Sequence, residues 1–175
     1  PKTILLHGDT RIDNYFWLRE KTNSEVTAYL EAENAYADAV MRPLAGFSDQ
    51  LYREMLGHLK ETDSSAPEHR GQFFYYSRTE AGKNYRIHCR KKGTLEAAEE
   101  IILDINKLAE GSKFFDVGTV LPSDDNRLLA YTTDTTGYRQ YTLQIKDLET
   151  GHLLPEKFER VNDVVWAPDN KTLFY

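Results

Sequence analysis

The chain has 175 residues, enough to bury about 70% of the surface that its unfolded form would expose. A hydrophobic content of 40% excludes a disordered segment, and a charged content of 29% excludes a membrane-spanning protein. The net charge of −6 is spread evenly without a basic face, which argues against nucleic-acid binding, and the single cysteine excludes a disulfide framework. No apolar run is long enough for a signal peptide or a membrane span, so we expect a cytoplasmic protein.

Residues 1–62 have the pattern of a helical segment. Thr22 and Glu25 form a capping box, which predicts a helix start, and Pro43 and Gly46 predict the end of that helix. Ser48 is expected to cap a second helix. Because the two helices would share little surface, we expect them to pack on another domain. Their apolar residues recur at helical spacing: Val26, Tyr29, Leu30, Tyr36, Ala37, Val40 and Met41, then Leu51, Tyr52, Met55, Leu56 and Leu59.

A cluster of turn-forming residues separates this segment from the rest of the chain. Residues 62–67 read Thr-Asp-Ser-Ser-Ala-Pro, and the short apolar runs beyond them are typical of consecutive antiparallel strands. We therefore predict a helical segment at 1–62 and a β domain at 63–175.

The β half repeats itself. Residues 125–131, Asp-Asn-Arg-Leu-Leu-Ala-Tyr, recur as residues 169–175, Asp-Asn-Lys-Thr-Leu-Phe-Tyr, at an offset of 44. An earlier copy is expected 56 positions upstream, where Tyr75 aligns with Tyr131, with an insertion around residues 95–110. Repeats of about 40–50 residues with short strands indicate a β-propeller. The alternative is a sandwich with two similar hairpins.

The expected propeller is incomplete. Closure needs at least about four blades, whereas these residues hold about two. The sequence therefore predicts the front piece of a longer protein. The open blade edges predict that the isolated fragment self-associates.

The opening residues 7–20, His-Gly-Asp-Thr-Arg-Ile-Asp-Asn-Tyr-Phe-Trp-Leu-Arg-Glu, resemble the start of prolyl oligopeptidase-family serine peptidases, and of the oligopeptidase B branch in particular. The resemblance continues through residues 31–34 (Glu-Ala-Glu-Asn), 139–141 (Arg-Gln-Tyr) and 147–151 (Asp-Leu-Glu-Thr-Gly). It implies a mainly β fold with N-terminal α-helices, in which these residues form the first blades of a seven-bladed propeller. The helices would pack on an α/β-hydrolase catalytic domain encoded beyond this chain.

The resemblance also implies a function. A serine-type oligopeptidase of this family hydrolyses short peptides, and its propeller acts as a lid that excludes folded proteins. The oligopeptidase B branch cleaves after Arg or Lys, and cleavage after Pro is the alternative. A non-enzymatic propeller that binds proteins is a further alternative. The expected partners are short peptides and the protein's own catalytic domain, with no cofactor, nucleic acid or membrane.

No catalytic or metal-binding residue is expected within the chain. It contains no Gly-x-Ser-x-Gly elbow, so the family's catalytic triad would lie elsewhere and the fragment alone would be inactive. The histidines lack metal-ligand spacing, and His7, beside a glycine, is expected to be a turn or packing residue. Cys89 is expected to be a buried, unreactive thiol. Trp17 and Trp166 are expected to be packing anchors, the second of them between blades.

Arg139 is the one candidate functional residue. It belongs to the Arg-Gln-Tyr segment, and the resemblance places that segment near the face where the propeller meets the catalytic domain. The resemblance implies that its guanidinium pairs with a carboxylate across this interface, or gates the substrate. The alternative is a solvated hairpin charge, worth at most about 1 kcal/mol.

Overall fold

The computed structural model describes all residues from Pro1 to Tyr175. The chain divides into two compact units, Pro1–Leu59 and Lys60–Tyr175. Each unit is described by itself. No helix in either unit combines the length and apolar character that crossing a bilayer requires.

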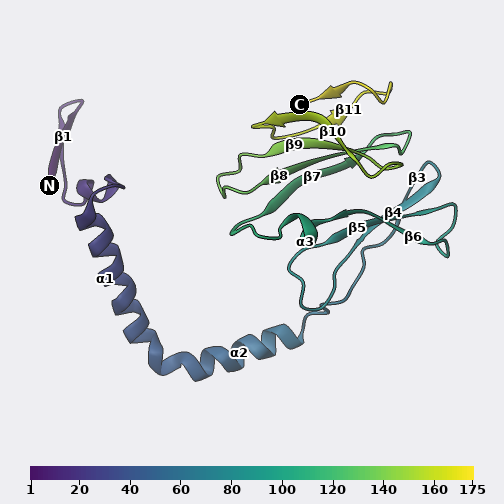
Figure 1. Ribbon diagram of the computed structural model, residues 1–175. Coiled ribbons are helices and arrows are strands. Elements are labelled where there is room, and N and C mark those ends of the chain that lie inside the picture. The colour runs from purple at the N-terminus through teal and green to yellow at the C-terminus, as the bar shows by residue number, and fades with distance from the viewer. The chain divides into compact units, whose positions relative to one another are not determined.

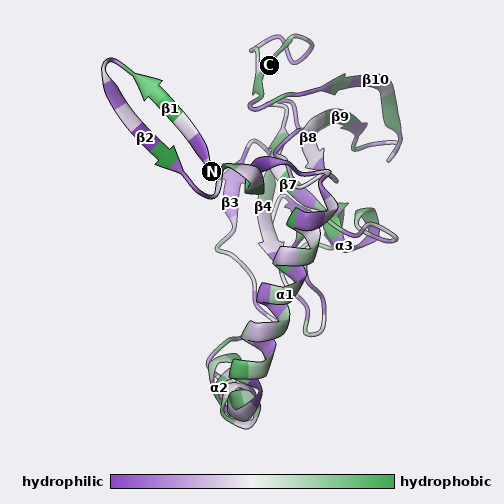
Figure 2. Ribbon diagram, turned by 90° about the vertical axis from the view of Figure 1, so that its left-hand side faces the viewer, coloured by the Kyte–Doolittle hydropathy of each residue, from purple (hydrophilic) through white to green (hydrophobic).

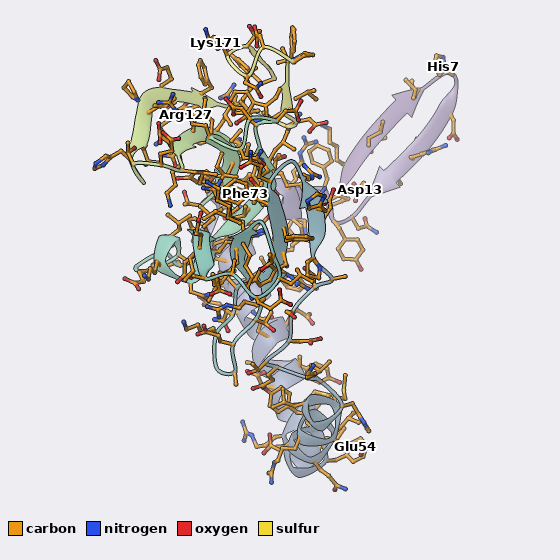
Figure 3. All side chains as sticks on the ribbon, turned by 90° about the vertical axis from the view of Figure 1, so that its right-hand side faces the viewer. His7, Asp13, Glu54, Phe73, Arg127 and Lys171 are labelled. Atoms are coloured by element: carbon orange, nitrogen blue, oxygen red, sulfur yellow. The ribbon has the colours of Figure 1, made fainter.

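The first unit begins with a β-hairpin rather than with a helix. Strands β1 (Lys2–Leu6) and β2 (Asp9–Asp13) pair antiparallel. The two residues between them, His7 and Gly8, both have positive φ, 49° and 80°, as a tight two-residue hairpin turn requires. Of the two roles expected for His7, the structure confirms the turn and not packing, since the residue is exposed, and Figure 3 shows it at the tip of the hairpin.

Helix α1 (Ser24–Met41) follows a short 3-10 turn, η1 (Phe16–Arg19). Its N-cap is Asn23, whose side-chain oxygen accepts a hydrogen bond from the Glu25 amide at 2.9 Å. The predicted cap at Thr22 is therefore wrong by one residue, because an asparagine side chain is at least as good a cap as a threonine. Trp17 packs edge-on against Tyr29 of α1, with ring centroids 5.6 Å apart.

The second helix starts earlier than the sequence predicted. A single 3-10 turn, η2 (Arg42–Leu44), connects α1 directly to α2 (Ala45–Gly57). Pro43 stands at the start of η2, where its missing N–H group costs nothing, so the chain continues to coil. Gly46 and Ser48 therefore lie inside α2, and neither acts as a terminator or cap.

The first unit has almost no core of its own. Val26 is its single buried residue, and Figure 2 shows hydrophobic residues in green within β1, α1 and α2. A two-stranded hairpin and two such helices are marginal in water without a surface to pack against. The exposed large apolar residues include Leu5, Leu6, Ile12, Tyr36, Val40, Met41, Phe47, Tyr52 and Met55.

The second unit consists of antiparallel sheets stacked face to face (Figure 1). The first blade has the order β3-β4-β5-β6, and the second has the order β7-β8-β9-β10. The pair β11-β12 begins a third. This confirms the propeller prediction. The strands are β3 (Glu68–Arg70), β4 (Phe73–Arg78), β5 (Ile87–Lys92), β6 (Glu99–Asp104), β7 (Asp116–Pro122), β8 (Leu128–Asp134), β9 (Thr142–Asp147), β10 (Leu153–Glu159), β11 (Val165–Trp166) and β12 (Leu173–Phe174).

The repeat at an offset of 44 is confirmed by the turns that precede β8 and β12. In the first turn the Ser123 amide donates to the Leu128 carbonyl at 2.8 Å, and in the second the Ala167 amide donates to the Thr172 carbonyl at 2.9 Å. Asn126 and Asn170 occupy the same left-handed position, with φ of 64° and 57°. Figure 3 shows Phe73, Arg127 and Lys171 at the same end of the three successive blades.

The earlier copy aligns at an offset of 55, so the predicted offset of 56 is wrong. The Gly93 amide donates to the Gln72 carbonyl in the first blade, and the Leu148 amide donates to the Arg127 carbonyl in the second, both at 2.8 Å. A one-residue slip moves every side chain to the other face of a sheet. Tyr75 therefore corresponds to Ala130 and not to Tyr131.

The extra residues of the first repeat also lie elsewhere than predicted. Residues 99–104 form β6, the regular fourth strand of the first blade. The insertion is the short helix α3 (Ile105–Leu108) and the loop that leads from it to β7. Asn106 fixes it, because its side-chain amide exchanges hydrogen bonds of 3.0 and 2.9 Å with the backbone of Tyr85.

Each pair of neighbouring blades encloses a hydrophobic layer. Leu129 and Tyr131 of β8 face the first blade and are almost fully buried there against Leu103. On the other face, Ala130 packs with Val164 toward the third pair of strands. Trp166 donates its indole N–H to the Leu121 carbonyl at 3.0 Å, which confirms the predicted anchor between blades.

Polar contacts reinforce the same junctions at the turns. The Tyr75 hydroxyl of the first blade donates to Asn126 Oδ1 at 2.9 Å. The Asp125 amide of the second blade donates to Asn170 Oδ1 at 3.1 Å. The position of the first blade that matches Asn126 is Gly71, where a β-carbon would lie only 2.8 Å from the Asn126 side-chain nitrogen. Each left-handed asparagine thus joins its own turn to the preceding blade.

Candidate functional site

The loop between β8 and β9 carries the candidate residue and is organised by a buried carboxylate. Asp134, at the end of β8, is only 1% exposed. Its Oδ1 accepts hydrogen bonds from the Thr136 amide at 2.8 Å and the Thr136 hydroxyl at 2.6 Å. Its Oδ2 accepts a bond from the Arg139 amide at 2.8 Å. Both oxygens are therefore used to fold the loop back on the end of its own strand.

Arg139 lies at the tip of this loop with its side chain free. Its backbone φ is 57°, a left-handed conformation that is uncommon for a residue with a long side chain. The residue is exposed, and its guanidinium makes no hydrogen bond or ion pair within the chain. Tyr138 beside it is 79% exposed. The loop thus exposes a positive charge and an aromatic ring on the surface of the second unit.

The base of the loop is anchored to β7. The Tyr141 hydroxyl donates to Asp116 Oδ2 at 2.5 Å. Its ring covers Gly118, where a β-carbon would lie 3.0 Å from Tyr141 Cε1 and 2.8 Å from Thr132 Oγ1. At the tip, a β-carbon on Gly137 would lie 3.9 Å from the ring of Phe114. The loop is therefore bonded to β7 at its base, and Gly137 lies close to Phe114.

The electrostatics of the loop favour an ionised Asp134. The hydrogen bond from the Thr136 hydroxyl has the largest effect and lowers the pKa of Asp134, and the amides of Thr136 and Arg139 act in the same direction. These donors outweigh burial, which raises the pKa. The hydrogen bond to Asp116 raises the pKa of Tyr141, so this phenol remains protonated at neutral pH. The backbone amide of the exposed arginine therefore contacts an ionised carboxylate.

Asp134 was not singled out from the sequence. Residues 134–137 read Asp-Thr-Thr-Gly, a pattern typical of a turn in which an aspartate bonds the backbone two residues later. That pattern could have identified the turn. It gave no indication that the same carboxylate also reaches the amide of Arg139.

The remaining candidates of the sequence do not form a site. Cys89 is fully buried as predicted, and burial raises the pKa of its thiol to about 11. His88 and Cys89 are adjacent on β5. No group of three or more histidine, cysteine, aspartate or glutamate side chains is arranged to hold a metal ion.

The fold places the chain among β-propeller proteins, and comparison with known families narrows this class. Residues 2–175 match the family model described as "Prolyl oligopeptidase, N-terminal beta-propeller domain". The chain therefore belongs to the prolyl oligopeptidase family of serine peptidases. The resemblance of its opening residues to this family is confirmed.

Individual relatives agree with this assignment. Dipeptidyl aminopeptidase BI of Pseudoxanthomonas mexicana is 43% identical over 97% of this chain and 26% of its own length. Protease 2 of Moraxella lacunata is 38% identical over 100% of this chain and 26% of its own length. The solved structure of oligopeptidase B from Leishmania major has a TM-score of 0.84 and 35% identity, over 91% of this chain and 23% of that one. The chain thus spans about a quarter of the length of these relatives.

Proposed function

We propose that this chain forms the N-terminal part of a serine oligopeptidase, with the helical segment 1–62 packed on a catalytic domain and residues 63–175 forming the first propeller blades. The observation that carries this proposal is the family match over residues 2–175. The exposed apolar surface of the first unit supports the packing, because so little of it is buried within the unit. In this proposal the catalytic serine, its base and its acid lie outside the chain, so the chain alone is inactive.

The proposed substrates are short peptides cleaved after Arg or Lys. Support comes from the identity of 38% to Protease 2 and from the structural similarity to oligopeptidase B. The propeller is proposed to act as a lid that admits short peptides and excludes folded proteins. A cytoplasmic location belongs to the same proposal.

A second candidate activity is the removal of dipeptides from a free N-terminus. The specific observation in its favour is the identity of 43% to the protein named dipeptidyl aminopeptidase BI. Cleavage after Pro has weaker support, from a prolyl endopeptidase of Elizabethkingia meningoseptica that is 24% identical over 90% of this chain.

Hydrolysis of matched peptides by the full-length protein distinguishes these activities. We expect cleavage after Arg and Lys in peptides with either free or blocked N-termini, and no cleavage of a folded protein that exposes the same residues. Cleavage confined to the second bond of free N-termini would instead support dipeptide release. Cleavage after Pro alone would support the prolyl activity, and no hydrolysis of any peptide would support a protein-binding propeller.

We propose that Arg139 pairs with a carboxylate of the catalytic domain and stabilises the closed, active arrangement. Its free guanidinium on an organised loop supports this role. In the full-length peptidase, Arg139→Ala should lower kcat/KM about tenfold, which corresponds to the loss of one charge-assisted hydrogen bond. The propeller should keep its thermal stability, because the exposed side chain makes no hydrogen bond or ion pair within it. Unchanged kinetics would remove the proposal and leave Arg139 as a solvated charge.

The isolated 175-residue chain should self-associate through its open blade edges. The third sheet has two strands, and Phe174 and Tyr175 at its edge are 63% and 67% exposed. Light scattering across a concentration series should show a mass that rises with concentration. A monomer of constant mass would contradict this expectation.

A further inference from the structure

Two charged residues at the β8–β9 connection, Asp134 at the end of β8 and Arg139 in the loop, differ in burial and in hydrogen bonding. Arg139 is exposed and free, whereas Asp134 is buried and bonded through both oxygens. No cation pairs with Asp134, so its negative charge is balanced by backbone amides and one hydroxyl. A buried carboxylate without a cationic partner is costly, and this one bonds only to its own loop.

We propose that Asp134 is the positioning residue for Arg139, and that its carboxylate sets the loop conformation in which the guanidinium meets its partner carboxylate. This inference rests on the proposed function of Arg139. The Oδ2 bond at 2.8 Å reaches the amide of Arg139 itself, the residue with the left-handed backbone. Without that acceptor the backbone at 139 would relax toward the negative φ values that arginine prefers, and the side chain would leave from a different direction.

The roles of the two carboxylate oxygens of Asp134 can be tested separately by a single substitution. Oδ1 accepts both bonds from Thr136, and Oδ2 accepts only the bond from Arg139. In Asp134→Asn, the amide oxygen can keep the two bonds from Thr136. The amide nitrogen would then face the Arg139 N–H, and two donors do not bond. The variant therefore releases the Arg139 backbone while it preserves the rest of the turn.

The second blade offers a matched control at its opposite end. Asp147 is also buried, and its Oδ1 accepts two backbone amides, those of Glu149 and Thr150, both at 2.9 Å, while its Oδ2 pairs with the partly exposed Arg127 at 3.3 Å. It organises the turn after β9, which carries none of the residues proposed to act in the peptidase. Asp147→Asn should therefore weaken a turn of the same blade without acting on Arg139.

The test is a double-mutant cycle on kcat/KM in the full-length peptidase. Asp134→Asn should lower kcat/KM about fivefold, and the double variant with Arg139→Ala should be no worse than Arg139→Ala alone, because both changes remove one interaction. Asp147→Asn should leave kcat/KM unchanged. If the two losses multiply in the double variant, or if Asp134→Asn has no effect while Arg139→Ala does, Asp134 does not act through Arg139.

The outcomes separate this inference from the proposal on which it rests. If Arg139→Ala itself leaves the kinetics unchanged, the proposed role of Arg139 fails first. If Asp134→Asn does not fold, Thr136→Ala is the milder variant, because it removes one donor to Asp134 and the acceptor of the Tyr138 amide. The same non-additivity with Arg139→Ala is expected for it, and additive losses would overturn the inference.

Discussion

Replacing Leu129 by alanine should lower the local unfolding free energy of the first two blades by about 3 kcal/mol. Leu129 is fully buried in the layer between the blades, together with Ile102, Leu103 and Tyr131. Its truncation removes contacts that neither sheet can replace without moving toward the other. Native-state hydrogen exchange in the full-length peptidase measures the effect, as faster exchange of the amides of β5 and β8.

Leu128 is the matched control for this prediction. It precedes Leu129 on the same strand, points to the other face and is half-buried. Leu128→Ala should cost about 1 kcal/mol, since less apolar surface leaves water at this position. Equal effects at 128 and 129 would mean that the layer between the first two blades is not the main source of stability.

Arg90→Met should destabilise the same junction by about 2 kcal/mol, the cost of losing hydrogen bonds from a charged group. The side chain of Arg90 is 6% exposed, and its guanidinium donates to Glu100 at 2.7 Å and to the Asn126 carbonyl of the second blade at 2.6 Å. It also lies 4.0 Å from the centre of the Phe73 ring. Methionine keeps most of the apolar stem, so the loss measures the charged group. Thermal unfolding and hydrogen exchange of the turn before β8 report it.

Lys92→Met provides the comparison for Arg90. Lys92 lies on the same strand and its ammonium is 5.9 Å from the same ring, but the residue is exposed. Its replacement should change stability by less than about 0.5 kcal/mol, as is usual at the surface. A similar loss in both variants would show that Phe73, and not the bond to Asn126, determines the effect of Arg90.

The propeller was predictable because the same turn-forming residues recur at the same place in successive blades. Asp and Asn before a strand form the same turn each time, and this pattern fixed the offset of 44 correctly. The first copy lacks that pattern and has Gly71 instead, so its alignment relied on aromatic residues. Aromatic residues occur on both faces of a blade. The predicted alignment of the first copy is therefore wrong by one residue, and it matches Tyr75 with Tyr131 instead of Ala130.

The errors in the first unit have a related cause. Asn23 and Thr22 are both good caps, and only the backbone geometry selects between them. The hairpin of β1 and β2 was missed because its turn, His7-Gly8, is not one of the common hairpin pairs. Arg139 was found through the resemblance alone. Asp134, which organises its loop, lies five residues away, and a contact at that spacing has no signal in the sequence.

The left-handed asparagines have a consequence for how blades of this kind diverge. Glycine and asparagine both satisfy the turn, so exchange of Asn126 for glycine would leave the backbone of its own blade intact. The exchange would nevertheless remove the hydrogen-bond acceptor for the Tyr75 hydroxyl, and with it one polar contact between the first and second blades. Substitutions that look neutral within one repeat can therefore change how firmly neighbouring blades are joined.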